Sequence, residues 1–242
     1  MTRLFHVSDV HFGAEDRAAT QWFARVARAE APDAVVVTGD LTMRARTREF
    51  AAAAQWLESF GCPTTVEVGN HDLPYFNLYA RFVTPYRRYR RVETMIERPL
   101  DIPGVTVVPL KTTARFQFRL NWSKGRVGAR ALNTALALAG QAPGGDAVLV
   151  ACHHPLVEAG TDSTARTRGG RAALAALAAA GVDAVLTGHV HDPFDVEHRV
   201  AGRGVRLIGA GTLSERVRAQ PPSFNELQIE GGRIEVRVRR MA

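Results

Sequence analysis

Two hydrophobic patterns alternate along roughly the first 190 residues of the chain. Short apolar runs, typical of strands buried on both faces, occupy residues 3–8, 34–38, 64–68, 105–110, 147–152 and 183–187. Apolar positions at helical spacing predict helices over residues 16–30, 46–60, 128–139 and 170–180. The first of these helices is expected to stop near Pro32, just before the apolar run AVVV.

After residue 192 the pattern changes to strands alone. The segments PFDVEHRV, GVRLIGAG, FNELQIEG and RIEVRVRR each predict a strand, and the last alternates with a period of two, as a strand with one exposed face does. An α/β half is therefore followed by a β-rich half, which predicts an α/β fold of two packed sheets flanked by helices. No repeat or long linker interrupts the chain, so we expect one domain covering residues 1–242.

Composition agrees with a globular protein that has a sizeable core, since 46% of the residues are apolar and 23% are charged. The two cysteines, Cys62 and Cys152, lack C-x-x-C spacing, so a disulfide framework is not expected and a reducing compartment fits. The longest apolar stretch is interrupted by Gly181 and Asp183 and is too short to cross a bilayer. No signal-peptide pattern opens the chain, and we expect a cytoplasmic protein.

The net charge of +7 raises the question of nucleic-acid binding. Only Lys111 and Lys124 among the 31 basic residues are lysines. In an alanine-rich chain, this excess of arginine is attributed to the codon composition of the gene more than to a binding surface. The densest basic run, RFVTPYRRYRR, could contact an anionic substrate, a phospholipid or a nucleic acid, but a solvated surface is the favoured interpretation. Nucleic acid is thus a possible partner that the sequence does not favour.

Polar side chains follow five of the predicted strands. These groups are Asp9-x-His11, Gly39-Asp40, the GNHD motif at 69–72, His153-His154 and the GHVH motif at 188–191. Ligand sites in α/β sheets form beyond the carboxyl ends of the strands, so these five groups are expected to meet.

The distribution of histidine supports one shared site. Six of the eight histidines lie in these five loops, while His6 is expected in the core or at a sheet edge and His198 in solvent. Gly39, Gly69 and Gly188 each precede a candidate ligand, where the backbone has to turn sharply beside an ion.

Carboxylate and amide oxygens with imidazoles, and no thiolates, are ligands that suit Mn²⁺, Fe²⁺/Fe³⁺ or Zn²⁺. Seven candidate ligands are more than one ion needs. Two ions about 3.5–4 Å apart that share a carboxylate would use them, lower the pKa of a bridging water and bind phosphoryl oxygens during in-line attack.

The motifs D-x-H, G-D, G-N-H-D, H-H-P and G-H-x-H, in this order between residues 9 and 191, resemble those of the calcineurin-like metallophosphoesterase superfamily. The segments SDVHFG and GDLT…EF are most similar to the bacterial cyclic-nucleotide phosphodiesterase-like (class III) branch. The resemblance implies a four-layer αββα sandwich with two mixed sheets and the metal site at the strand carboxyl ends. It also implies the metal ligands Asp9, His11, Asp40 and His191 for one ion, and Asn70, His153 and His189 with the bridging Asp40 for the other.

The same resemblance assigns catalytic roles. A hydroxide that bridges the two ions shared by Asp40 would attack in line, and His71 would contact the phosphate and protonate the leaving oxygen. His154 is expected to be structural, and Asp72 to cap the following turn or to orient His71. Leu41, Thr42 and Met43 follow Asp40, so the tyrosine ligand of purple acid phosphatases is missing and an iron–tyrosinate site is not expected.

The expected substrate is a small anionic phosphoester, a diester in preference to a monoester. No lysine or arginine lies inside the motifs, so a diester monoanion fits better than a monoester dianion. Loops 112–127, with a predicted hairpin at Phe116, Phe118 and Leu120, and 161–171 would form a rim around the second substituent. A nuclease, a phosphomonoesterase and a non-catalytic interaction module on the same fold are the alternatives. An interaction module would be expected to lose the ligands, and 242 residues leave little room for a DNA-binding domain.

Overall fold

The computed structural model describes residues 1–74, 79, 83, 92–114, 121, 123–161, 167–200, 202–217 and 220–241. The arginine-rich run at 81–91 apart from Val83, the predicted hairpin at 115–120 and the centre of loop 161–171 lie outside the described residues.

Two β-sheets form the middle of the molecule. The first sheet has the order β11-β10-β1-β2-β3, with the bounds Arg233–Arg240, Ser223–Glu230, Thr2–Val7, Ala34–Val37 and Thr64–Val66. The second sheet has the order β4-β5-β6-β7-β9-β8, with the bounds Leu100–Ile102, Val105–Pro109, Ala147–Ala151, Ala184–Thr187, Arg203–Gly209 and Phe194–Val200. Both sheets are mixed, because β1, β2 and β3 run parallel, as do β5, β6, β7 and β9, while β10, β11, β4 and β8 pair antiparallel.

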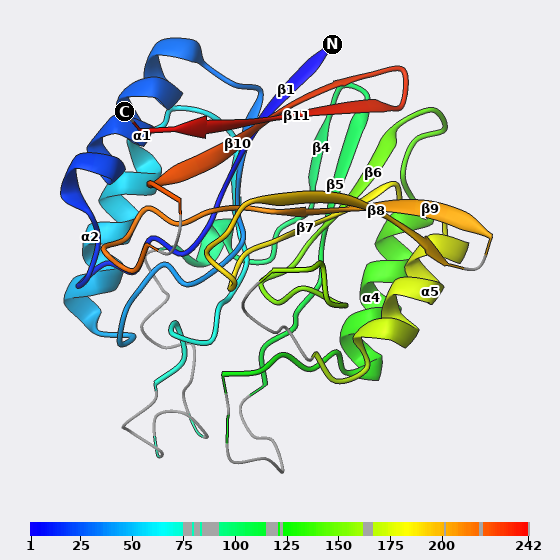
Figure 1. The fold of residues 1–242 in the computed structure, drawn as a ribbon, viewed down its shortest axis with the longest axis horizontal. Coiled ribbons are helices and arrows are strands. Elements are labelled where there is room, and N and C mark those ends of the chain that lie inside the picture. Colours follow the sequence, from blue (N-terminus) through cyan, green and yellow to red (C-terminus); the bar gives the residue numbers. More distant parts are fainter. Residues whose placement is uncertain are drawn as a thin grey trace.

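Helices cover the outer face of each sheet, which makes four layers (Figure 1). The helices α1 (Arg17–Glu30) and α2 (Thr47–Glu58) lie on the first sheet, and α4 (Ala129–Ala139) and α5 (Gly170–Ala179) lie on the second. A short 3₁₀ helix, η2, spans Glu93–Met95. The expected αββα sandwich is therefore confirmed.

The strand sequences explain the layering. Neighbouring residues of a strand point to opposite faces, so in β1 Leu4 packs between the two sheets while Phe5 packs against α1. Phe5, Phe23 and Phe224 are fully buried and in ring contact with one another. A third apolar cluster lies between the second sheet and the helices α4 and α5. Strands buried on both faces account for the continuous apolar runs of the sequence.

Helix ends follow local chemistry. Asp16 caps α1, since its side chain accepts a hydrogen bond from the backbone N–H of Ala19 at 3.0 Å. The side chain of Glu49 accepts from the N–H of Arg46 at 3.1 Å and closes the first turn of α2. The four predicted helices occur, as do the predicted strands that fall within the described residues, whereas β4 between Pro99 and Pro103 had no sequence signal.

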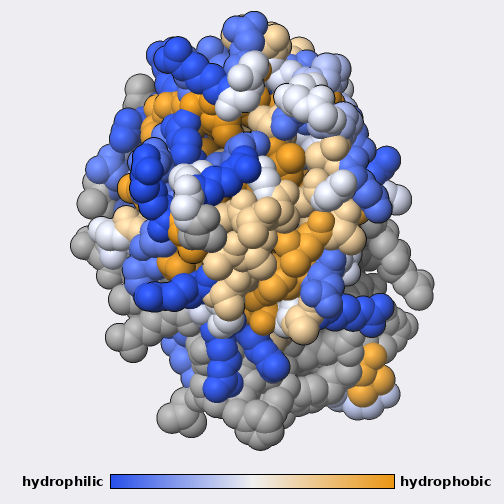
Figure 2. All heavy atoms as spheres, turned by 90° about the vertical axis from the view of Figure 1, so that its right-hand side faces the viewer, coloured by the Kyte–Doolittle hydropathy of each residue, from blue (hydrophilic) through white to orange (hydrophobic). Residues whose placement is uncertain are grey.

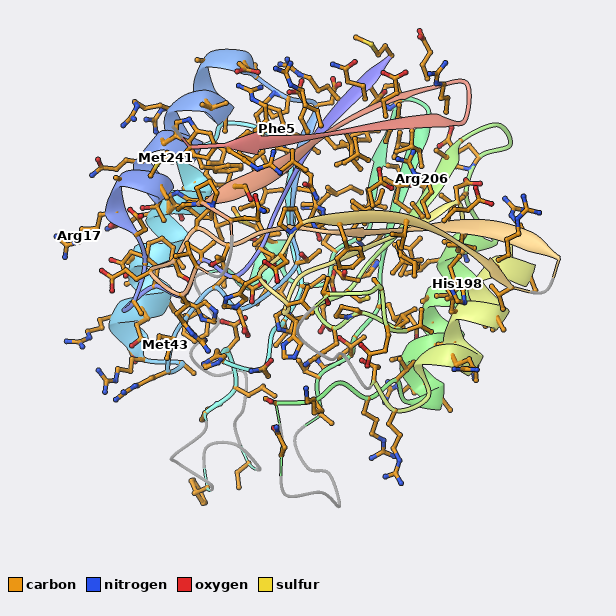
Figure 3. The ribbon with its side chains drawn as sticks, viewed as in Figure 1. Phe5, Arg17, Met43, His198, Arg206 and Met241 are labelled. Atoms are coloured by element: carbon orange, nitrogen blue, oxygen red, sulfur yellow. The ribbon has the colours of Figure 1, made fainter. Side chains whose placement is uncertain are left out.

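Two side chains of the second sheet are visible in Figure 3. Arg206 on β9 donates to the carbonyl oxygen of Ile234 on β11 and so ties the two sheets together. His198 on β8 is half-buried, so the prediction that it faces solvent is only partly right. His6, by contrast, is fully buried, with its Nε2 atom 3.0 Å from Thr38 Oγ1.

The outer side of α4 and α5 carries small apolar side chains bordered by hydrophilic ones (Figure 2). Across the described part of the chain, no helix has the length and apolar character needed to span a bilayer.

Candidate metal centre

The five loops chosen from the sequence meet at one place between the sheets. One cluster there contains Asp9, His11 and His191, all buried. Asp9 Oδ1 lies 3.1 Å from His191 Nε2 and 3.7 Å from His11 Nε2, and the two Nε2 atoms are 3.4 Å apart. The structure thus brings together ligand atoms from the loops after β1 and β7.

Asp40 connects this cluster with a second one. Its Oδ2 atom lies 3.8 Å from His11 Nε2 and 3.4 Å from His153 Nε2. His153 Nε2 is in turn 3.2 Å from Asn70 Oδ1. The carboxylate of Asp40 therefore stands between the two groups of candidate ligands, where a bridging ligand would be needed.

The remaining candidate ligand, His189, lies beside His153. Their ring centroids are 5.2 Å apart, and the N–H of His189 donates to Asp9 Oδ2 at 2.8 Å. Burial, and then the neighbouring His153, lowers the pKa of His189 to about 3. A neutral ring is the form that binds a metal ion.

Hydrogen bonds between the loops hold this arrangement. The N–H groups of Asp9 and His11 donate to the carbonyl oxygens of Gly39 at 3.0 Å and Asp40 at 2.9 Å. The N–H of Gly188 donates to the carbonyl oxygen of His153 at 3.0 Å. These backbone hydrogen bonds continue the strand pairing of β1 with β2 and of β6 with β7 into the loops that follow these strands.

The backbone is strained at most of the candidate ligands. Five of the eight described non-glycine residues with positive φ belong to the set: Asp9 (54°), His11 (52°), Asp40 (51°), His189 (71°) and His191 (64°). Such conformations cost on the order of 1–3 kcal/mol each and gather at functional sites.

The glycines before the ligands allow close approaches. A Cβ atom on Gly69 would stand 2.1 Å from Asp40 Oδ1, and one on Gly188 would stand 1.8 Å from Ser8 Oγ and 2.6 Å from Asp9 Oδ2. At Gly39 a Cβ atom would stand 2.6 Å from His153 Nδ1. These three positions therefore need glycine because candidate ligand residues lie too close for a side chain.

Hydrogen bonds on the outer side of two rings orient the inner nitrogen. His153 Nδ1 is 2.7 Å from the carbonyl oxygen of Thr38, and His191 Nδ1 is 2.9 Å from that of Arg216. A carbonyl oxygen only accepts, so each Nδ1 carries a proton and the Nε2 lone pair of the neutral ring points into the centre.

These lone pairs lie beside carboxylate oxygens, and Asp9 Oδ1 is buried without a hydrogen bond. Although burial lowers it, the pKa of His153 is raised to about 9 by Asp40, whose own pKa is lowered chiefly by His153 against the effect of burial. A metal ion between the carboxylate of Asp40 and the imidazole of His153 would balance the negative charge of the carboxylate, as a proton does. The oxygen and imidazole donors present fit Mn²⁺, Fe²⁺/Fe³⁺ or Zn²⁺.

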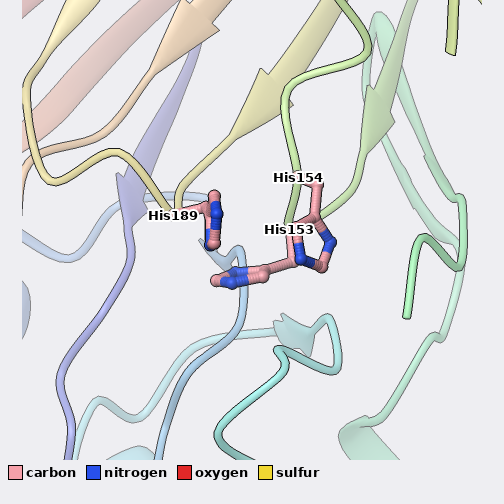
Figure 4. A group of neighbouring side chains, drawn as sticks. All are labelled: His153, His154 and His189. Atoms are coloured by element: carbon pink, nitrogen blue, oxygen red, sulfur yellow. The ribbon is translucent and has the colours of Figure 1, made fainter. Parts of the chain in front are cut away.

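His154 lies close enough to His153 and His189 to form a third group of neighbouring imidazoles (Figure 4). Its ring nitrogens are both used elsewhere: Nδ1 is 3.0 Å from Thr112 Oγ1, and Nε2 is 2.8 Å from the carbonyl oxygen of Ser123. His154 thus has no ring nitrogen left for an ion, and it joins Thr112 to Ser123.

Asp72 makes contacts between the loops that were not predicted from the sequence. Its carboxylate accepts hydrogen bonds from the N–H groups of Leu41 at 3.2 Å, Thr42 at 2.8 Å and Gly69 at 2.9 Å. Burial and then the charge of Asp40 raise its pKa to about 7. The buried Asp72 therefore joins the loop after β2 to the loop after β3.

His71 lies at the edge of the centre, half-buried. Its Nδ1 atom is 2.9 Å from the carbonyl oxygen of Met43, and its ring packs edge-on against His11 with centroids 4.8 Å apart. The N–H of His71 donates to Asp40 Oδ1 at 2.8 Å. The Nε2 atom of His71 lies at the open side, 3.2 Å from Arg216 Nη1.

Arg216 is the residue that sequence reasoning missed. It follows β9 outside every motif, yet its Nη1 atom lies 3.2 Å from His71 Nε2 and 3.4 Å from His11 Nε2. No arginine lies inside the motifs, but Arg216 brings a guanidinium to the same centre from a loop outside them. No local pattern marks this position, because the loop after β9 reaches the centre only through the pairing of β7 with β9.

The predicted rim is visible in part. Arg168 donates its N–H to the carbonyl oxygen of Gly125 at 2.9 Å, and the N–H of Val127 donates to the carbonyl oxygen of Arg168 at 2.9 Å. Loops 112–127 and 161–171 are thus joined at their described ends.

Solved structures share the fold. A dimetal phosphatase from Danio rerio has a TM-score of 0.72 and 15% identity, with 98% of this chain and 96% of that chain covered. A protein from Thermus thermophilus has a TM-score of 0.62 and 18% identity, with 97% of each chain covered. A purple acid phosphatase from yellow lupin (Lupinus luteus) seeds has a TM-score of 0.67 and 12% identity, and its match covers 99% of this chain and 51% of the lupin chain.

No curated protein sequence matches the chain. The family profile described as calcineurin-like phosphoesterase matches residues 2–193, the part that contains all five ligand loops. The protein therefore belongs to the calcineurin-like phosphoesterase family.

Proposed function

We propose that this protein is a phosphoester hydrolase that works with two metal ions. The observation that carries the proposal is the position of Asp40 between two groups of buried, inward-pointing donors. Asp9, His11 and His191 would hold one ion with Asp40, and Asn70, His153 and His189 would hold the other with Asp40. Two such ions, Mn²⁺, Fe²⁺/Fe³⁺ or Zn²⁺, would supply an acidified water and positive charge for phosphoryl oxygens.

The chain itself contributes a proton donor. Met43 fixes the ring of His71 through Nδ1, so that Nε2 lies on the open side of the centre next to Arg216. A protonated Nε2 atom at this place would protonate the leaving oxygen of the ester. His71 is therefore proposed as the general acid.

The metal assignment is tested by metal analysis of protein purified without chelator. Wild-type protein should hold close to two transition ions per chain, and Asp40→Ala should lose both because each ion depends on this carboxylate. Asp101→Ala, which removes an exposed carboxylate from β4, is the matched control and should keep both. Full occupancy in Asp40→Ala would overturn the assignment.

For the substrate we propose a small phosphodiester, since the joined loops 112–127 and 161–171 would contact a second substituent. Phosphomonoesters are the second candidate, favoured by the guanidinium of Arg216 at the centre. The comparison is kcat/KM for bis-p-nitrophenyl phosphate and p-nitrophenyl phosphate with equal Mn²⁺ loading. A clear preference for the monoester would refute the diester proposal. Hydrolysis of cyclic nucleotides or of DNA in the same panel would identify the class of phosphodiester that the enzyme prefers.

A further inference from the structure

We infer that Arg216 binds the phosphoryl oxygens of the substrate and sets how well the enzyme accepts monoesters relative to diesters. This inference rests on the proposed function and concerns the same site. It begins from the guanidinium of Arg216, which is aimed at the metal centre although the residue belongs to an exposed loop.

The backbone of Arg216 is tied to the ligand residues. Its carbonyl oxygen accepts from His191 Nδ1 at 2.9 Å, and its N–H donates to Ser214 Oγ at 3.3 Å. Ser214 Oγ is 2.7 Å from Thr212 Oγ1, which donates to the carbonyl oxygen of Asp9 at 2.6 Å. The backbone at this position is therefore held in place beside the candidate ligands.

At its end, the guanidinium has weak partners. Among the described residues, the partners of its Nη1 atom within hydrogen-bond distance are two imidazole nitrogens, at 3.2 Å and 3.4 Å. A phosphoryl oxygen is charged, so its hydrogen bond with a guanidinium is shorter and about twice as strong as one with a neutral acceptor. An arriving phosphate would thus replace His71 as the partner of Arg216.

In this exchange the guanidinium compensates charge on the phosphate. A monoester dianion brings two negative charges and three terminal oxygens, whereas a diester brings one charge and two terminal oxygens. A fixed cation therefore favours the monoester more than the diester.

The test compares wild-type protein with Arg216→Ala, Arg216→Lys and the control Arg199→Ala, which removes an equal charge from the exposed end of β8. All four proteins are loaded with Mn²⁺, their metal content is measured, and inorganic phosphate is titrated calorimetrically. The two p-nitrophenyl esters then give kcat/KM.

Arg216→Ala should keep its metal, bind inorganic phosphate about 10- to 100-fold more weakly and lose a similar factor in kcat/KM for the monoester, since hydrogen bonds to charged groups have about this value. Its loss with the diester should be several-fold smaller. Arg216→Lys should recover part of the phosphate affinity, and Arg199→Ala should match wild type.

Equal losses with both esters together with unchanged phosphate affinity would overturn the inference, as would loss of metal from Arg216→Ala, which would make the residue structural. Wild-type protein that hydrolyses neither ester would refute the proposed function instead. The phosphate titration of wild type against Arg216→Ala would still decide whether Arg216 binds phosphate.

Discussion

The substitution Gly69→Ala tests how the fold positions Asp40. A Cβ atom at this position would stand 2.1 Å from Asp40 Oδ1 and 2.2 Å from the backbone nitrogen of Asp40. The backbone of Gly69 does not require a positive φ, so alanine is compatible with its conformation and the effect comes from the contact alone. A backbone atom cannot turn aside as the end of a flexible side chain can, so the two loops have to separate.

The expected cost follows from overpacking, which destabilises by about 1–3 kcal/mol. For a chain of this length, about 2–4 °C per kcal/mol gives a decrease in melting temperature of roughly 2–12 °C. Separation of the loops also moves the carboxylate of Asp40, and displaced orienting contacts lower metal affinity by about 10- to 100-fold.

The assay pairs calorimetric melting of the metal-free protein with Mn²⁺ titration. Gly144→Ala is the control, because a Cβ atom there has nothing within 4 Å and the change should stay within about 0.5 kcal/mol. Wild-type melting and wild-type metal affinity in Gly69→Ala would show that the close approach does not position Asp40.

Three further predictions concern catalysis, metal and pH. His71→Ala should keep its metal and lose about 10²–10⁴-fold in kcat, less for p-nitrophenolate than for alkoxide leaving groups, and equal losses would exclude proton donation. Mn²⁺ at 100 times its Kd should stabilise wild type by about 2.7 kcal/mol per site in a melting assay, but not Asp40→Ala. Burial and then Glu97 raise the pKa of Glu67, so wild type should lose stability as pH rises above the unfolded-state pKa of about 4.3. Glu67→Gln should therefore melt higher than wild type at pH 8, with the gap closing towards pH 4, whereas a constant gap would contradict this reasoning.

Much of the fold could be predicted because the central strands, such as β2, β6 and β7, are buried on both faces. In β2, Val36 packs between the sheets and Val35 against the helices, so the strand reads as an unbroken apolar run. The helices have one buried side, and α1 ends at Glu30, close to the predicted stop near Pro32. The three residues of β4 are too few for a periodic pattern, and prolines on either side obscure them.

The order of the strands depends on contacts that no local pattern contains. β1 pairs with β10, so that Leu4 lies opposite Leu227 at the far end of the chain. The candidate ligands could nevertheless be predicted, because all five loops follow strands whose carboxyl ends had to meet. The contacts of Asp72 with Leu41 and Thr42 could not be predicted, since these partners lie some 30 residues away in sequence.

Arg216 shows why a motif search underestimates the charge of the centre. Each motif carries its ligands within a few residues of a strand end, whereas Arg216 reaches the same place from the loop after β9, seven residues beyond Gly209. Its position follows from the hydrogen bond between its carbonyl oxygen and His191, a contact made by the backbone that any residue could make. Only the guanidinium of Arg216 contributes to the centre, and no neighbouring residue in the sequence distinguishes this arginine from the others.

The strained backbone of the candidate ligands would affect metal binding. Left-handed conformations at Asp9, His11 and Asp40 are held by hydrogen bonds to the neighbouring loop, which are formed when the chain folds. The free energy that these conformations cost is therefore balanced by folding and not by binding of the ions. Ions that enter such a centre meet donors already in place, and the loss of conformational entropy on binding is small. The contacts of Gly69 and Gly188 maintain the same preorganisation, which is why a single methyl group there is expected to affect metal affinity as well as stability.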